Sequence, residues 1–184
     1  IEYHLDLLKP KNGYGLNQNN HACQHFLYYE YYNILGPKKY NKYFKFSIVR
    51  NPIDRIVSEY YWTPLDLGHK NGKTFEEFLK NVELIIKNKS FYITEYHDHF
   101  IPQSNFILDK NNRLMVDKVY RFEKMNEIEK YIIKLGKKNK KKIKRMQKNK
   151  NKEYIFKRYK PNKKQIQKIY ELYKRDFINF NYSI

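Results

Sequence analysis

Residues 43–62, YFKFSIVRNPIDRIVSEYYW, predict a strand, a sharp polar turn and a helix. Aromatic and β-branched residues dominate positions 43–49, and alternate side chains share one face of the expected strand: Phe44, Phe46 and Ile48. Pro52 suits the first helical position, because the N–H that proline lacks would have no intrahelical partner there. An apolar stripe follows at helical spacing, formed by Ile53, Ile56, Val57, Tyr60 and Tyr61. A helix with this stripe is expected to pack on the sheet that contains the strand.

The turn between the expected strand and helix carries Arg50. A guanidinium fork, the first amides of a helix and the helix dipole all favour an anion at this place, phosphate above all. The alternative is an ordinary strand–helix unit in which Arg50 and Arg55 are solvated or paired with a carboxylate. The pattern by itself is compatible with both interpretations.

Other helices are expected on both sides of this unit. One covers residues 26–35 and ends at Gly36-Pro37. A second begins after Thr74, with Glu77 as its capping-box partner, and should bury Phe78, Leu79, Val82, Ile85 and Ile86.

The second half of the chain predicts two strands and two helices. Residues 105–108 and 114–122 are expected to be strands that flank a turn at 109–112. A helix over 125–135 should stop at Gly136, and a terminal helix is expected over 162–180, with a core-facing stripe of Ile166, Ile169, Tyr170, Tyr173 and Phe177. Strands that alternate with helices predict an α/β layer fold around a mainly parallel sheet.

The composition is strongly basic. Among 184 residues, 38 Lys and Arg against 19 Asp and Glu give a formal charge of +19. Such a surface attracts nucleic acid, acidic glycans, anionic membranes or nucleotides without choosing among them. With only six Gly and six Pro, a collagen-like or disordered chain is not expected. The low-complexity basic run at 137–152 is expected to be a mobile loop or arm within a single domain that spans residues 1–184.

Cys23 is the single cysteine, so an internal disulfide and a cysteine-based zinc site are excluded. No apolar run has the length of a membrane span, and no signal peptide opens the chain. The first residue is Ile1 and not methionine, which predicts a fragment or a processed form.

The order VRNP-x-x-R-x-x-S-x-x-Y, from Val49 to Tyr61, closely resembles the 3′-phosphate-binding segment of sulfotransferases that use 3′-phosphoadenosine 5′-phosphosulfate (PAPS). It is most similar to the carbohydrate sulfotransferases of the heparan 2-O and chondroitin types. In that family the arginine of VRNP and the serine eight residues later hold the 3′-phosphate. The resemblance therefore implies Arg50 and Ser58 as nucleotide ligands, with Arg55 as a structural residue or a secondary phosphate contact.

Three more segments resemble the same family and extend the match over most of the chain. They are HFIPQS at 99–104, VDKVYRFE at 116–123 and YELYKRDFINFNY at 170–182. The resemblance implies a three-layer, P-loop-kinase-like sulfotransferase fold with a mainly parallel central sheet flanked by helices. It also implies sulfuryl transfer from PAPS, without a metal, to a hydroxyl of a carbohydrate acceptor, most simply an oligo- or polysaccharide.

In this family the general base is a histidine shortly before the VRNP strand. The matching residue is His25, in Gln24-His25, and His21 is the nearby alternative. A base within hydrogen-bond reach of the acceptor hydroxyl would remove its proton during an in-line transfer. Without the resemblance, a histidine satisfied on a loop or at a helix start would be the simpler interpretation.

A second polar cluster contains His97, Asp98 and His99. On an extended segment, two histidines at i and i+2 could share one side and hold a metal, but a zinc site needs a third ligand that the sequence does not nominate. Substrate binding by His99, and by His97 beside it, is therefore the preferred hypothesis. The alternative for His99 is a structural cap buried by Phe100. Glu123 is interpreted as a catalytic carboxylate or as a residue that orients an arginine.

One expected element lacks a good counterpart. These enzymes begin with a P-K-T-G-G-T-like loop around the 5′-phosphosulfate, and the nearest segment, residues 10–15 with Lys11, is a poor copy that lies too close to His25. The true loop is expected to precede Ile1. The family also implies a nucleotide contact near the loop before the terminal helix, at Asn151 and Lys152.

Two alternatives to an active sulfotransferase stay open. A nucleic-acid-binding protein would use the positive charge and the abundant tyrosines for base stacking. A catalytically inactive relative would act as a binding module. The resemblance implies a Golgi location for a eukaryotic protein and leaves a cytoplasmic location open for a viral or bacterial one.

Overall fold

The computed structural model describes residues 25–63, 67–69, 72–93, 96–138 and 159–184 of the chain. Residues 10–15 with Lys11, His21, Cys23 and most of the basic run at 137–152 lie outside the described residues.

The central strand–turn–helix unit forms as predicted. Strand β1 (Phe46–Val49) leads through a two-residue turn into α3 (Pro52–Trp62). Pro52 occupies the first turn, and the Asn51 side chain accepts a 2.9 Å hydrogen bond from the Ile53 amide as N-cap. The strand is shorter than the seven residues expected, because pairing begins only at Phe46.

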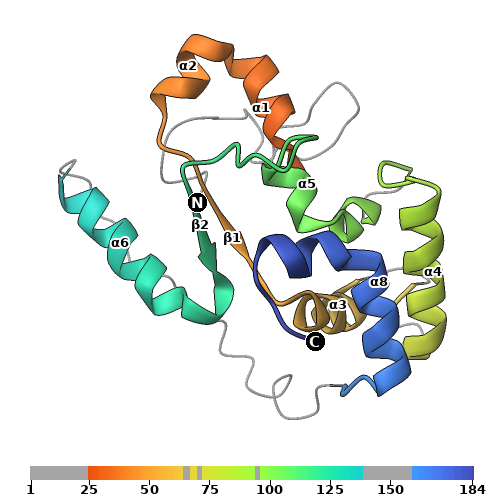
Figure 1. Cartoon of the computed structure of the whole chain (residues 1–184). Helices are drawn as coiled ribbons and strands as arrows, with labels where there is room; N and C mark the ends of the chain where they lie inside the picture. Colours follow the sequence, from red (N-terminus) through yellow and green to blue (C-terminus); the bar gives the residue numbers. More distant parts are fainter. Residues whose placement is uncertain (1–24, 64–66, 70–71, 94–95, 139–158) are drawn as a thin grey trace.

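Strand β2 (Lys118–Arg121) lies parallel to β1, with Phe46 opposite Lys118 and Val49 opposite Arg121. These two strands form the only sheet among the described residues. After a 3-10 turn, η5 (Phe122–Lys124), the chain enters α6 (Met125–Lys138), which Figure 1 shows on the opposite side of the strands from α3, α4 and α8. The expectation that this helix stops at Gly136 is wrong, since α6 continues to Lys138.

The main core is helical. Helix α3 packs with α4 (Phe75–Lys87) and α8 (Lys163–Asn179), which lie together in Figure 1. The capping box of Thr74 and Glu77 starts α4 as predicted, and Asn162 with Gln165 forms an equivalent box at α8. The fully or almost fully buried side chains of this core are Ile56, Val57, Phe75, Phe78, Leu79, Val82, Phe100, Ile169, Tyr173 and Phe177.

The predicted strand at residues 105–108 is wrong. Residues Gln103–Ile107 form the short helix α5, and the only pairing nearby is an isolated antiparallel bridge between Leu108 and Leu114. The helix starts here because Asp176 of α8, which is fully buried, accepts the amides of Gln103 at 2.8 Å and Ser104 at 2.7 Å. A cap that comes from 72 or more positions away leaves no local sequence pattern.

The N-terminal described helices are α1 (Tyr28–Leu35) and α2 (Pro37–Lys42). The first confirms the helix expected over 26–35, ended at Gly36 with a φ of 73°. A second helix, which was not expected, begins at Pro37. It can begin there because proline is suited to the first helical position as well as to a position after a helix end. The Tyr40 hydroxyl donates to the Met115 carbonyl at 2.8 Å, so α2 is held against the segment that leads into β2.

Residues His97–Phe100 form a 3-10 turn, η4, and not the extended segment on which His97 and His99 would share one side. Phe100 is fully buried, and its carbonyl accepts a 3.0 Å hydrogen bond from the Tyr173 hydroxyl of α8. The turn is therefore anchored to the helical core, while its histidines lie closer to the surface.

The architecture is a mixed α/β fold with a small parallel sheet, as expected for the class. Among the described residues, no helix combines the length and the apolar character that crossing a membrane requires.

Candidate active site

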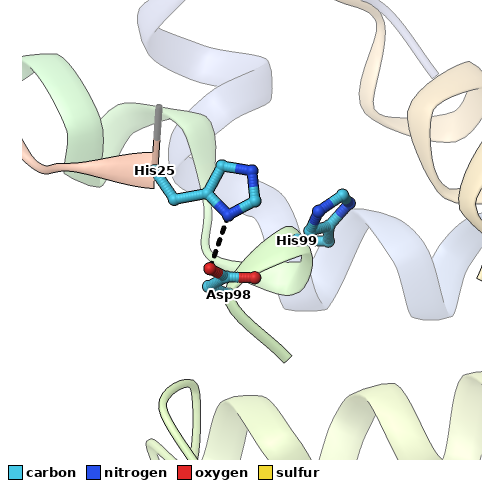
Figure 2. Close-up of side chains that lie close together, drawn as sticks. All are labelled: His25, Asp98 and His99. Carbon is cyan, nitrogen blue, oxygen red and sulfur yellow. Dashed lines mark hydrogen bonds and ion pairs between the residues drawn. The ribbon is translucent and has the colours of Figure 1, made fainter. Parts of the chain in front are cut away.

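His25 and Asp98 form the closest polar contact of the site. Nδ1 of His25 lies 2.5 Å from Oδ2 of Asp98, although 73 positions separate the residues in the sequence (Figure 2). Asp98 is 3% exposed and His25 is 20% exposed, so the carboxylate is buried and the imidazole borders solvent. An ionised carboxylate only accepts hydrogen bonds, so Nδ1–H donates and Nε2 keeps its lone pair. The pair therefore presents an imidazole oriented to accept a proton at Nε2.

The second carboxylate oxygen of Asp98, Oδ1, is available to a ligand. Oδ1 is buried and has no hydrogen-bond partner among the described residues. An unsatisfied buried oxygen is costly, and it favours a donor that enters the site, such as a water or a ligand hydroxyl.

His99 forms a second histidine–carboxylate pair beside the first. Its Nδ1 lies 3.2 Å from Oε2 of Glu59, and the His25 and His99 rings meet edge to face with centroids 4.6 Å apart. The indole of Trp62 stacks on the His99 ring at 4.5 Å and an interplanar angle of 7°. His99 is thus fixed on three sides, by Glu59, His25 and Trp62.

Helix α3 presents these partners on one face. Arg55, Glu59 and Trp62 follow the spacing i, i+4 and i+7, which at 100° per residue lies opposite the apolar stripe. The Arg55 guanidinium donates to the carbonyls of His99 at 2.6 Å and Ile101 at 2.9 Å. One face of α3 therefore packs into the core and the other holds the turn that carries Asp98 and His99.

The structure adds a third possible metal ligand to the cluster of histidines and Asp98. His25 joins Asp98 and His99 in a group whose ligand atoms all lie within 4.8 Å of one another, so the structure supplies the third ligand that the sequence did not nominate. Ligand atoms around a tetrahedral zinc ion lie about 3.3 Å apart. The 2.5 Å separation of His25 Nδ1 and Asp98 Oδ2 is shorter than this and is a hydrogen-bond distance.

Tyr92 lies within electrostatic range of Asp98. Burial raises the pKa of Tyr92 to about 12, and the charges of Glu30, Tyr29 and Asp98 act in the same direction. The Tyr92 side chain is 40% exposed.

At the start of α3, Gln103 holds the backbone of Arg50. The Arg50 amide donates to Oε1 of Gln103 at 2.8 Å, and Nε2 of Gln103 donates back to the Arg50 carbonyl at 2.9 Å. The Arg50 guanidinium lies over the Phe122 ring at 4.9 Å. The glutamine of the HFIPQS segment thus fixes the arginine of the VRNP segment.

Glu123 occupies the position at the helix start where an anion was expected. Its Oε1 accepts the Asn51 amide at 2.8 Å, and its Oε2 accepts the Tyr182 hydroxyl at 2.9 Å. Burial alone would raise its pKa, but these hydrogen bonds and the charge of Arg50 lower it overall. Because the Ile53 amide is also taken by Asn51, a phosphate bound here would be held by side chains more than by these two amides.

The other residues predicted for the site do not join the His25–Asp98–His99 cluster among the described residues. Ser58 lies in α3, four residues before Trp62, and is partly buried. His97 points elsewhere than its neighbour, since its Nδ1 lies 3.0 Å from the Ser90 carbonyl after α4. Lys152 and His21 lie outside the described residues.

Three contributors to the site were missed from the sequence: Glu59, Trp62 and Gln103. The positions of Glu59 and Trp62 carried a usable signal, because with Arg55 they form a second helical stripe opposite the apolar one. Gln103 belongs to the HFIPQS segment, but no local pattern marks its contact with Arg50, which lies 53 positions away.

An imidazole held by a buried carboxylate is typical of enzymes that take a proton from an acceptor group. The model of the Sulfotransferase family matches residues 16–183, which is most of the chain, and the protein therefore belongs to that family. This membership supports a transferase that moves sulfuryl groups. No curated protein and no solved structure matches the chain.

Proposed function

We propose that the protein transfers a sulfuryl group from PAPS to a hydroxyl of a carbohydrate acceptor, with His25 as general base. The observation that carries this proposal is the 2.5 Å contact between His25 and the buried Asp98, in a chain of the Sulfotransferase family. It leaves one imidazole nitrogen oriented to accept a proton.

The chemistry follows from this geometry. The acceptor hydroxyl gives its proton to Nε2 of His25 while its oxygen forms a bond to sulfur, and the bond from sulfur to the phosphate oxygen breaks. The phosphate leaves with that electron pair, as adenosine 3′,5′-bisphosphate. Asp98 stabilises the imidazolium that forms, and its negative charge lies 2.5 Å away before the reaction begins. No metal takes part in this scheme.

The donor would be held chiefly by Arg50 and Ser58, as the 3′-phosphate ligands of α3. The clamp from Gln103 supports this role, because it fixes the backbone from which the Arg50 side chain extends. Arg55 is proposed to act as a brace, since its guanidinium already donates to the carbonyls of His99 and Ile101. A contact from Lys152 is part of the proposal that rests on the family resemblance alone.

The acceptor is proposed to be an oligo- or polysaccharide that meets His99, whereas Nδ1 of His97 lies 3.0 Å from the Ser90 carbonyl. A formal charge of +19 favours an anionic glycan. The fold proposed around this site is the three-layer, P-loop-kinase-like sulfotransferase fold, and the parallel pairing of β1 and β2 with helices on both sides supports it.

Nucleotide binding tests the proposal most directly. Adenosine 3′,5′-bisphosphate at a hundred times its Kd would stabilise the folded state by about 2.7 kcal/mol, which corresponds to a Tm increase of about 5–10 °C. Arg50→Ala and Ser58→Ala should reduce the increase. Lys174→Ala, which removes an exposed positive charge of α8, should retain it.

Absence of nucleotide stabilisation would contradict the proposal. If the nucleotide gives no stabilisation while RNA or DNA binds tightly and loses affinity with salt, the nucleic-acid alternative replaces the sulfotransferase proposal. The burial of Tyr60 and Tyr173 in the core speaks against that alternative, because these tyrosines cannot stack on bases.

A further inference from the structure

Trp62 combines exposure with a fixed orientation. It is the single tryptophan of the chain and the last residue of α3, and 49% of its surface is exposed. One face of the indole is covered by the His99 ring at 4.5 Å. The Tyr96 and Trp62 rings meet edge to face, with centroids 5.8 Å apart. A large, half-exposed aromatic face held in this way is typical of a binding surface and not of a folding core.

The contacts around His99 keep this surface rigid. Glu59 holds Nδ1 of His99, and the Arg55 guanidinium holds its carbonyl. Both residues come from the same face of α3 as Trp62, so the stacked rings move with the helix. A rigid aromatic surface loses little conformational entropy when a ligand packs on it.

The stacked pair adjoins the proposed base. The His99 ring contacts both Trp62 and His25, with centroid distances of 4.5 Å and 4.6 Å respectively. A hydroxyl that gives its proton to His25 must lie within about 3 Å of the accepting nitrogen. A ring that lies against the Trp62–His99 pair would therefore bring its substituents close to the base.

We propose that the Trp62–His99 pair is the acceptor subsite, on which one sugar ring packs its C–H face while a hydroxyl of that ring reaches His25. This inference rests on the proposed function and adds the residue that selects the acceptor. A pyranose has an apolar face and a polar edge, and the site offers an indole face beside two imidazoles and two carboxylates. Trp62 is here a specificity-determining residue, and His25 alone performs the proton transfer.

The position of Trp62 separates this subsite from the proposed 3′-phosphate site. Arg50 precedes the first turn of α3 and Trp62 ends its last turn. Ten residue steps of 1.5 Å place the two ends of the helix about 15 Å apart. The nucleotide base is therefore the less favoured occupant of the Trp62 surface, and the experiment distinguishes it from a sugar.

The single tryptophan makes binding directly observable. The probes are oligosaccharides of chondroitin and of de-O-sulfated heparin, titrated into the full chain with adenosine 3′,5′-bisphosphate present. At least one should change the Trp62 emission in a saturable way and protect it from acrylamide quenching. If neither oligosaccharide does so, or if the nucleotide alone gives the protection, the inference is overturned.

Substitutions of Trp62 test its contribution to acceptor binding, with calorimetry for the oligosaccharide affinity and steady-state kinetics for the acceptor KM. Trp62→Ala should weaken oligosaccharide binding about tenfold or more and raise the acceptor KM with little change in kcat. Trp62→Phe keeps an aromatic face and should retain most of the affinity. Phe44→Ala is the matched control, because Phe44 is similarly exposed at 47% but contacts Phe46 and Tyr131. Unchanged acceptor affinity in Trp62→Ala would overturn the proposal.

Different results would contradict the sulfotransferase function and the Trp62 acceptor subsite. Nucleotide stabilisation that depends on Arg50 tests the proposed function and does not involve Trp62. If this stabilisation is present and Trp62→Ala binds sugars normally, only the acceptor subsite is wrong. If the stabilisation is absent in the wild-type chain, the proposed function fails, and the subsite as an acceptor site fails with it.

Discussion

Asp98 accepts a hydrogen bond from Nδ1 of His25 at 2.5 Å, and the carboxylate is buried while the imidazole borders solvent. The imidazole of His25 is therefore held in one orientation. The carboxylate selects the tautomer in which Nε2 accepts a proton, and it stabilises the charge that follows.

Asp98→Asn should lower kcat by about 10²- to 10⁴-fold and leave the nucleotide Kd nearly unchanged, because it removes the charge opposite the imidazolium and keeps the side-chain volume. Single-turnover kinetics and the nucleotide-induced Tm increase measure the two effects. Asp54→Asn, which alters a carboxylate in the first turn of α3, is the control and should retain kcat. Full activity of Asp98→Asn would show that the His25–Asp98 pair is structural.

Gln103→Ala should weaken nucleotide binding without a direct contact to the nucleotide. The substitution leaves the Arg50 amide and carbonyl without the partners they have at 2.8 Å and 2.9 Å. Loss of this clamp should also reduce the free energy of unfolding by about 1–3 kcal/mol. Calorimetric titration with adenosine 3′,5′-bisphosphate and urea unfolding measure the two effects.

Gln167→Ala is the control for this substitution, since Gln167 is exposed and bonds only with Glu171 among the described contacts. A Gln103→Ala variant that is destabilised but binds the nucleotide with wild-type affinity would contradict a positioning role.

The site was only partly predictable, for a physical reason. His25 and His99 could be nominated because the family resemblance marks their positions in the chain. Their carboxylate partners could not, because Asp98 meets His25 only after the turn at His97–Phe100 has docked against the segment that leads into α1. The metal alternative changed for the same reason, since its third ligand comes from a distant segment.

The fold shows the same division between local and distant causes. The apolar stripe of α3 and the capping box of Thr74 and Glu77 are local patterns, and both are confirmed. Helix α5 was predicted as a strand because its cap, Asp176, belongs to α8. Propensity alone cannot anticipate a cap from another element.

Asp176→Ala should reduce the free energy of unfolding by about 1–3 kcal/mol, because two amides of α5 lose a fully buried acceptor. Urea unfolding followed by circular dichroism measures this loss. Glu171→Ala, an exposed change on the same helix, should alter stability by less than about 0.5 kcal/mol. Equal effects of the two substitutions would show that the cap contributes little.

Glu123 should add a pH-dependent contribution to folding stability. Although burial would raise its pKa, hydrogen bonds from the Asn51 amide and the Tyr182 hydroxyl lower it below the ordinary value of 4.5. A carboxyl group whose folded pKa is lower than its unfolded pKa stabilises the folded state fully above the unfolded value. That stabilisation is lost as the pH falls through the folded pKa.

Glu123→Gln should therefore be less stable than the wild type near neutral pH, and the difference should shrink as the pH falls below 4.5. Urea midpoints at about pH 7, about pH 4 and about pH 3 follow the stability difference as the pH falls below the ordinary glutamate pKa. Glu129→Gln, on α6, controls for the loss of one negative charge. A stability difference that stays constant over this range would mean that the Glu123 carboxylate does not depend on its charge to hold the start of α3.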